Sequence, residues 1–178
     1  MSLLRWWPGA SPSTPLVRPH SSDMATSAYN YALNLLSVRS YSEKNMRRKL
    51  LSRAFAPPDT ELAIESLLAN GLLDDRGYAE QFARGRLLGR GASRLRLRQQ
   101  LFTRGIEGEL ADSAIDAVIA DDEIDLEAVA EKAAAKKVAS IAGLDAAVIR
   151  RRLYGHLARA GYTPDTIRAA MKKVLGAE

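Results

Sequence analysis

Few residues of this chain could carry out catalysis or hold a metal. The sequence contains two histidines, His20 and His156, and no cysteine, so thiolate metal sites, disulfides and cysteine nucleophiles are excluded. Neither histidine stands at metal-ligand spacing from another candidate ligand. The adjacent carboxylates of Asp74 and Asp75 could form an acid–base pair, but a helix is expected to begin there, and its dipole stabilises a carboxylate at that end. The sequence therefore predicts no enzymatic activity, no metal and no cofactor.

Arginine is concentrated in clusters, and its planar guanidinium makes bidentate contacts with phosphate and carboxylate groups. Residues 39–104 and 132–178 are strongly basic, and they flank residues 105–131, which hold ten acidic residues and no basic one. The formal net charge of the whole chain is +5. This distribution predicts an anionic macromolecular partner. The alternative is a solvated basic surface that the acidic segment balances.

The elements that must position these residues are expected to be α-helices. From Ala28 onward, Ala, Leu, Arg and Glu dominate, and no strand-like alternation occurs. Three similar turns end a basic helix and carry a large apolar residue, which is Phe55, Ile106 or Tyr162. Apolar residues stand nine and five positions before each of the three, namely Met46 and Leu50, Leu97 and Leu101, and Leu153 and Leu157. The turns are 51 and 56 residues apart, a repeat length that fits three helices.

The repeat predicts an all-α fold of three tandem three-helix units over residues 28–73, 74–122 and 123–178. The expected helices are Ala28–Val38, Glu43–Arg53, Pro58–Asn70, Asp75–Leu88, Arg94–Arg104, Glu107–Ala120, Asp125–Val138, Ala146–Ala160 and Pro164–Leu175, with Gly89, Arg90 and Gly91 as a turn. A unit of this length has a thin core, so stacking would extend the core from neighbour to neighbour and produce an elongated, curved molecule. The alternative is three independent modules, which the short joins at 71–73 and 121–124 argue against.

Several residues are expected to end or cap these helices. Ser42, Ser93 and Asp145 stand where a side-chain oxygen can cap a middle helix. Residues 1–27 are expected to form a disordered arm rich in proline and serine, because frequent proline prevents a helix. Met24 could be the true start. No apolar run reaches the roughly 18–20 residues of a membrane helix, so we expect a soluble, cytoplasmic monomer.

The predicted core contains the large apolar residues of the middle unit and of the three turns, namely Tyr78, Phe82, Leu97, Leu101, Phe55, Ile106 and Tyr162. Leu95 and Phe102 form a second ridge on the helix that begins at Arg94. This ridge either packs on a neighbouring unit or forms an exposed docking strip. Aromatic residues are scarce near the basic clusters, so a dedicated base-stacking platform for single strands is weakly supported.

The stretch GLLDDRGYAEQF, residues 71–82, resembles a signature of the RecX family, regulators of the bacterial recombinase RecA. The segments that follow, RGR at 84–86 and residues 90–106, and the upstream segment 32–50 are similar to the same family. The resemblance is dense over residues 28–106, whereas the third unit matches mainly in layout. The sequence departs from the family in its N-terminal arm and in Gln100, where an acid is common.

This resemblance implies a protein that binds RecA–DNA filaments in their helical groove and damps ATP hydrolysis and strand exchange. Single- or double-stranded DNA would be a secondary contact. We expect the contacts to come from Arg84, Arg86, Arg90, Arg94, Arg96, Arg98, Arg104, Lys44, Arg47, Arg48 and Lys49. Two alternatives stay open: a sequence-nonspecific DNA-binding protein, since such units resemble helix-turn-helix modules, and a scaffold repeat without effect on the recombinase.

Overall fold

The computed structural model describes residues 21–176, in which the only regular elements are nine α-helices. The first unit contains α1 (Ser21–Leu36), α2 (Glu43–Ser52) and α3 (Pro57–Ala69). The second contains α4 (Asp75–Arg90), α5 (Arg94–Phe102) and α6 (Gly108–Asp121). The third contains α7 (Leu126–Ala139), α8 (Ala146–Arg159) and α9 (Pro164–Leu175). The predicted all-α fold of three-helix units is confirmed.

Each unit has its own hydrophobic core, built to one pattern. The first helix of a unit packs along the third, and it presents two buried alanines one turn apart. These pairs recur every 51 residues, as Ala28 and Ala32, Ala79 and Ala83, and Ala130 and Ala134. Because the distance between packed helices depends on the side chains at the contact, alanine lets the two helices approach closely.

The middle helix of each unit closes this core with two large side chains. All six residues at the repeated offsets are completely buried, namely Met46, Leu50, Leu97, Leu101, Leu153 and Leu157. The middle helices start where side-chain caps were expected: the oxygens of Ser42, Ser93 and Asp145 accept hydrogen bonds from backbone N–H groups of the first turn.

Some predicted boundaries are wrong. Helix α1 begins at Ser21, inside the predicted disordered arm, because the prolines of that arm end at Pro19 and no other proline follows until Pro57. The predicted arm at residues 1–20 lies outside the described residues. Helix α4 continues to Arg90, through part of the predicted turn, and ends at Gly91 in the left-handed conformation. Helix α5 ends two residues early, at Phe102.

The same contact joins both pairs of neighbouring units. The hydroxyl of Ser42, at the start of α2, donates a hydrogen bond of 2.6 Å to the carbonyl of Arg104, just after α5. The hydroxyl of Ser93, at the start of α5, donates one of 2.6 Å to the carbonyl of Ala160, just after α8. The positive end of one middle helix therefore meets the negative end of the next, an arrangement that the helix dipoles favour.

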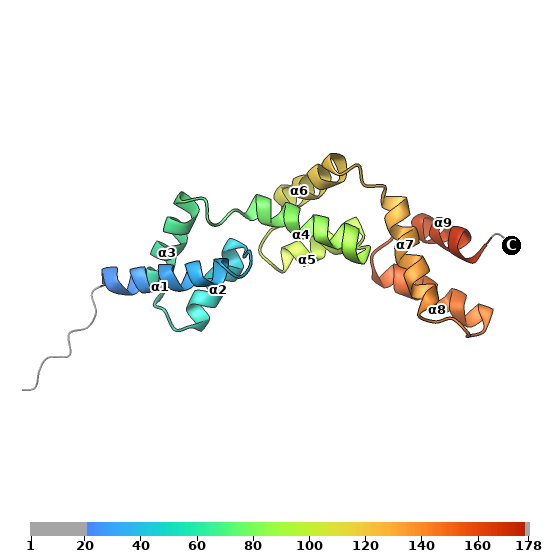
Figure 1. Ribbon diagram of the computed structural model, residues 1–178, viewed down its shortest axis with the longest axis horizontal. Helices are drawn as coiled ribbons and strands as arrows, with labels where there is room; N and C mark the ends of the chain where they lie inside the picture. Colours follow the sequence, from blue (N-terminus) through green and yellow to red (C-terminus); the bar gives the residue numbers. More distant parts are fainter. Residues whose placement is uncertain (1–20, 177–178) are drawn as a thin grey trace, which may run out of the picture.

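Further hydrogen bonds fix each junction. Between the first and second units, the backbone N–H of Glu43 donates to the Asp75 carboxylate at 2.8 Å, and burial raises the pKa of that carboxyl. Between the second and third units, the Tyr162 hydroxyl donates to the carbonyl of Gly91 at 2.5 Å, and burial raises the pKa of Tyr162 to about 12. The units form one elongated, bent row (Figure 1), so the predicted stacking is confirmed.

Candidate functional site: cationic clefts at the two junctions

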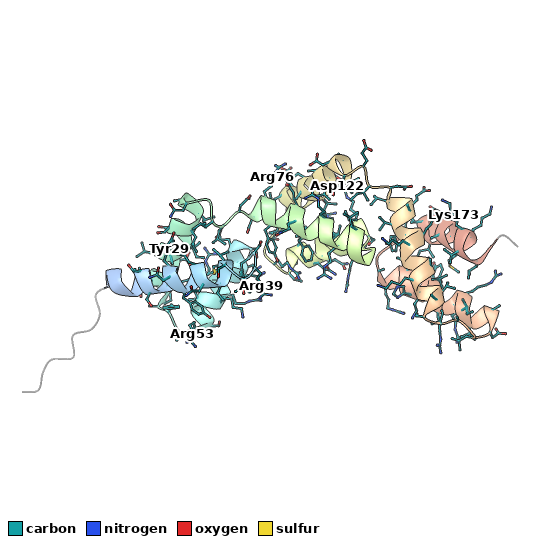
Figure 2. All side chains as sticks on the ribbon, viewed as in Figure 1. Tyr29, Arg39, Arg53, Arg76, Asp122 and Lys173 are labelled. Atoms are coloured by element: carbon teal, nitrogen blue, oxygen red, sulfur yellow. The ribbon has the colours of Figure 1, made fainter. Side chains whose placement is uncertain are left out.

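Some of the predicted partner-binding arginines form ion pairs inside their own unit. Arg47 of α2 binds Glu43 and Glu61, each at 2.8 Å, and Arg84 of α4 binds Asp122 at 2.7 Å. The hydrogen bonds that these guanidinium groups donate to the carboxylates raise the pKa of both arginines above their usual range. Figure 2 shows Asp122 at the end of α6, next to α4. These two arginines thus already have anionic partners.

The arginines on one side of α5 also pair with the acidic helix α6. The guanidinium of Arg94 donates hydrogen bonds to the Asp116 carboxylate, and these bonds raise the pKa of Arg94. Arg98 forms an ion pair with Asp112 at 3.0 Å. The acidic segment that separates the two basic segments in the sequence therefore neutralises arginines of its own unit. These arginines therefore fit the alternative of a basic surface that the acidic segment balances.

A different set of basic residues gathers in two clefts, one at each junction. The first cleft, between the first and second units, has a volume of about 360 Å³. Its charged and aromatic lining residues are Arg39, Arg48, Lys49, Arg104, Tyr41 and Tyr78. Arg39 lies at the end of the first unit that faces the second (Figure 2), with its guanidinium 4.6 Å from the centre of the Tyr41 ring. None of the described residues lining this cleft is acidic.

The second cleft, between the second and third units, is larger, with a volume of about 810 Å³. Its ionisable lining residues are Arg86, Arg96, Lys136, Lys137, Arg159 and His156. They come from α4, α5, α7 and α8, so only the junction brings them together. Here too, the lining contains no carboxylate among the described residues.

The two clefts occupy the same place in the repeat. The first is lined by Tyr41, Asn45 and Lys49 at one turn of spacing, and the second by Ala92, Arg96 and Gln100, each 51 residues later. Each cleft thus lies at the corresponding place of its own junction.

The ring of Phe82 connects the two clefts. The guanidinium of Arg104, from the first cleft, lies 4.3 Å from the ring centre, and that of Arg86, from the second, lies 4.9 Å from it. Cations at such distances are attracted by the ring quadrupole. Phe82 also stacks on Tyr78, at a centroid distance of 6.3 Å. We call the basic residues of both clefts the cationic track.

His156 reports the electrostatics of the second cleft. Burial, together with the charges of Lys137 and Arg159, lowers the pKa of its imidazole. The cleft thus disfavours additional positive charge. An anion bound in the cleft would instead raise the pKa of the His156 imidazole.

The structure separates the predicted partner-binding residues into groups. Five line a cleft, namely Arg48, Lys49, Arg86, Arg96 and Arg104. Four are in ion pairs, namely Arg47, Arg84, Arg94 and Arg98. The side chain of Lys44 packs against the position of Gly105 in the first junction, and the side chain of Arg90 lies outside the described residues.

Sequence reasoning missed several residues that line the clefts, namely Arg39, Tyr41, Lys136, Lys137, Arg159 and His156. The repeat could have pointed to part of this set, because residues at equivalent positions of two units line equivalent places. The C-terminal end of α8, where Arg159 lies, occupies the same place in its unit as the Thr103 and Arg104 end of the preceding middle helix. No local pattern marks Lys136 and Lys137, which come from the first helix of the third unit.

The predicted core residues differ in burial. Leu97, Leu101 and Ile106 are fully buried. The four aromatic residues, Phe55, Tyr78, Phe82 and Tyr162, are half-buried and pack against the edges of their unit's core. The aromatic residues therefore stand at the border between the core and the surface, and Tyr78 also lines the first cleft.

The second ridge of α5 is largely exposed, although Leu95 lies next to Gly161 of the third unit. The exposed fraction is 52% for Leu95 and 58% for Phe102. Leu95 borders a groove of about 330 Å³ at the second junction, together with Leu126 and Tyr162. This groove lies on a different side of α5 from Arg96 and Gln100.

The described residues include no group of three side chains that could hold a metal ion. Asp74 caps α4 by accepting from the N–H of Arg76 at 3.0 Å, and Asp75 accepts from Glu43. Both carboxylates are thus engaged with helix N-termini. None of the helices that the structure describes has the length and apolar character needed to cross a bilayer.

Comparison with known proteins gives matches over most of the described chain. Residues 28–67, 74–115 and 123–171 match the first, second and third three-helix domains of RecX. The regulatory protein RecX of Trichlorobacter lovleyi is 35% identical over 157 residues, covering 85% of this chain and 98% of that protein. The regulatory protein RecX of Mycobacterium leprae is 31% identical over 160 residues, covering 90% and 92%.

Solved structures share the architecture. The crystal structure of RecX from Lactobacillus salivarius superposes with a TM-score of 0.69 at 21% identity, covering 86% of this chain and 97% of that one. A second crystal structure, of a regulatory protein RecX, has a TM-score of 0.68 at 22% identity and covers 87% and 73%. At these identities the structures show the fold, while the family is shown by the sequence matches. The chain belongs to the RecX family.

Proposed function

We propose that this protein regulates a RecA recombinase by binding in the helical groove of the RecA–DNA filament, where it inhibits ATP hydrolysis and strand exchange. It acts as a cytoplasmic monomer, by binding rather than by catalysis, and needs no cofactor. Its membership in a family of regulatory proteins supports this proposal, as does the resemblance of residues 71–82 to the family signature.

The observation that carries the proposal is the rigidly joined, bent row of three units. Because the junction hydrogen bonds are repeated at Ser42 and Ser93, surfaces that are far apart in the sequence keep a defined spacing. Such a row can contact several subunits of a helical polymer at once, so individually weak contacts add to a large combined affinity.

Ion pairs within the second unit limit which charges can contact a filament groove. Asp112, Asp116 and Asp122 of the acidic segment are engaged with arginines of the second unit, so they are not available as a separate negative surface. The complementary surface is instead the cationic track, whose residues lie at the two junctions of the row. Electrostatic complementarity of this kind favours the encounter and sets the register of binding.

The proposal is tested by titrating the protein into a RecA reaction with single-stranded DNA and measuring ATP hydrolysis. We expect inhibition well below one molecule per RecA subunit, because one row of units spans several subunits. Bovine serum albumin at the same concentrations serves as a control. No inhibition at equimolar protein would overturn the proposal.

The cationic track also favours a second candidate function, direct sequence-nonspecific DNA binding. That function predicts tight binding to bare duplex DNA, with log affinity falling by roughly 0.9 per phosphate contact as log salt rises. A filament regulator instead binds bare DNA weakly and the assembled filament far better. Comparing the two affinities in one buffer distinguishes the candidates.

A further inference from the structure

A groove between α1 and α3 of the first unit shares no residue with either junction cleft. Its volume is about 360 Å³, and Tyr29, Leu62, Ser66 and Asn70 are among the residues that line it. The exposed fraction of Leu62 is 49%. Tyr29 lies in the half of α1 that is farther from the second unit (Figure 2). The groove therefore presents apolar side chains, together with hydroxyl and amide groups, at the outer part of the row.

The repeat shows that this apolar surface is particular to the first unit. Tyr29 corresponds to Glu80 in the second unit and to Glu131 in the third, at intervals of 51 residues. Each of these glutamates forms an ion pair within its own unit. Leu62 corresponds to Ser113, again 51 residues later. Because the equivalent surfaces are polar, the apolar groove of the first unit marks a contact surface rather than a requirement of the fold.

The helices that form the groove carry negative charge only. Neither α1 nor α3 contains a lysine or an arginine. On α3, Glu61 is held by Arg47 at 2.8 Å, whereas Glu65 is exposed and forms no ion pair with a described residue. The groove thus suits an apolar segment that carries a positive charge, and it disfavours a nucleic acid or an acidic peptide.

Residues 1–20 of this chain have the complementary composition. They contain Trp6 and Trp7 beside Leu3 and Leu4, with Arg5 between the two pairs, and no acidic residue. An indole ring offers a large apolar area together with one N–H group that needs an acceptor when it is buried. The hydroxyl groups that line the groove can accept this hydrogen bond.

We propose that residues 3–7 dock in the groove of their own chain, with the tryptophan rings on Tyr29 and Leu62 and with Arg5 beside Glu65. The segment then forms a strap over the outer surface of the first unit. This inference goes beyond the proposed function, because it assigns an occupant to a surface that the cationic track does not include.

The length of the connection allows this contact. Residues 8–20 join Trp7 to the start of α1, and a chain of that length spans up to roughly 45 Å. The groove begins at Ala25, about one helical turn from the start of α1. Because the tether keeps the segment at a high effective concentration, docking within one chain needs only a modest intrinsic affinity.

The fluorescence of the tryptophans tests the proposal directly. Trp6 and Trp7 are the only tryptophans of the sequence, so the intrinsic emission reports on this segment alone. We expect emission at shorter wavelength than in urea, and protection from quenching by acrylamide. Leu62→Ser introduces the residue that the second unit has and should weaken docking roughly tenfold, as for a central interface residue. Its emission should therefore move toward the value in urea.

The matched control is Leu95→Ser on α5. Leu95 is 52% exposed, so the same change is made at a similarly exposed leucine in another unit. Its emission should equal that of the unmodified protein, and circular dichroism shows that both variants are folded. Emission of the unmodified protein at the wavelength seen in urea, equal responses to the two substitutions, or a response to Leu95→Ser alone would each overturn the proposal.

A pair of charge reversals tests the position of Arg5. Glu65→Lys should weaken docking severalfold at low salt and less at high salt, because salt screens an exposed ion pair. Glu109→Lys makes the same change at an exposed position of α6, in the second unit, and should leave the emission unchanged. Equal emission of the two variants would contradict the proposed contact.

Nuclear magnetic resonance tests the contact from the side of the groove. The methyl signals of Leu62 should move in W6A/W7A, which removes the indole rings, and stay in place in L16A/V17A, which truncates two other apolar residues of the same segment. Unchanged Leu62 signals in W6A/W7A would overturn the proposal.

Dilution distinguishes docking within one chain from docking between two copies. The emission should be independent of protein concentration, because the tether belongs to the same molecule. A shift toward the value in urea on dilution would assign the groove to the segment of a second copy and overturn the proposed arrangement. None of these measurements involves a recombinase, so their outcome is independent of the proposed function.

Discussion

At the scale of single residues, the turn after each middle helix shows how a junction constrains the sequence. Gly105 and Gly161 adopt positive φ angles of 88° and 86°, and Ala54 has the equivalent position with a φ of 67°. A Cβ atom at Gly105 would collide with the Lys44 side chain, and one at Gly161 would lie 2.7 Å from the Ser93 hydroxyl. Glycine is thus required where a neighbouring unit packs, whereas Ala54 is exposed.

This difference predicts opposite effects of two substitutions at equivalent positions. Gly161→Ala should destabilise the protein by roughly 2 kcal/mol or more, because the left-handed backbone costs about 1–2 kcal/mol and the new methyl group disturbs the junction. Ala54→Gly should raise stability by less than about 1 kcal/mol, since relief of the same strain is partly offset by the greater freedom of glycine in the unfolded chain. Thermal unfolding followed by circular dichroism measures both. A fall in melting temperature for Ala54→Gly would contradict this account.

At the scale of elements, α5 has two sides with different tasks. Arg94 and Arg98 face the acidic helix α6 and pair with Asp116 and Asp112. Arg96 points into the second cleft. Residues two positions apart on a helix do not share a face. The arginines of this cluster therefore split into two that form ion pairs within the unit and one that lines the cleft. Helix α5 thus carries both ion-paired arginines and a residue of the track.

We therefore expect arginine-to-alanine changes on α5 to separate stability from binding. Arg94→Ala with Arg98→Ala should lower stability by about 1 kcal/mol or less in total, because exposed ion pairs contribute little each, and should affect oligonucleotide affinity by no more than about twofold. Arg96→Ala should leave the melting temperature unchanged and weaken oligonucleotide binding severalfold. Urea unfolding and anisotropy on the same preparations make the comparison. The opposite assignment of effects would show that Arg94 and Arg98 bind the partner.

At the scale of the whole molecule, the length and curvature of the row depend on the two junctions. Ser42 and Ser93 stand 13 residues before Phe55 and Ile106, where they start their helices. The residue 13 positions before Tyr162 is Ile149, which lies inside α8 because that helix has an additional turn starting at Ala146. Helix α8 is capped by Asp145 instead, so the third middle helix does not start with a serine hydroxyl like those of Ser42 and Ser93.

The junction hydroxyl should determine the shape of the row. Ser93→Ala removes both the cap of α5 and the bond to Ala160, whereas Asp145→Ala removes only the cap of α8. Asp145→Ala should lose about 1 kcal/mol, which corresponds to roughly 2–4 °C in melting temperature for a chain of this size, and Ser93→Ala should lose more because it also removes the junction hydrogen bond. Only Ser93→Ala should broaden the distance distribution between the second and third units in small-angle X-ray scattering. Identical scattering of the two variants would mean that other contacts fix the junction.

The sequence by itself determined the local structure of this protein. The repeated pairs such as Leu97 and Leu101, and the caps at Ser42 and Ser93, predict three-helix units, and these units are confirmed. Such signals act within a few residues, through helical periodicity and the hydrogen bonds of helix ends, so they can be recognised without knowing the fold. The family signature in residues 71–82 is equally local.

Only the tertiary structure decided which charges remain available. Whether an arginine is neutralised depends on where α6 lies relative to α4 and α5, and the clefts exist only where two units meet. The predicted set therefore mixed ion-paired residues such as Arg84 with cleft residues such as Arg96, and it omitted Lys136 and Lys137. Electrostatic interactions depend on distance in space, and residues from four helices converge on one cleft without any periodicity in the sequence to connect them.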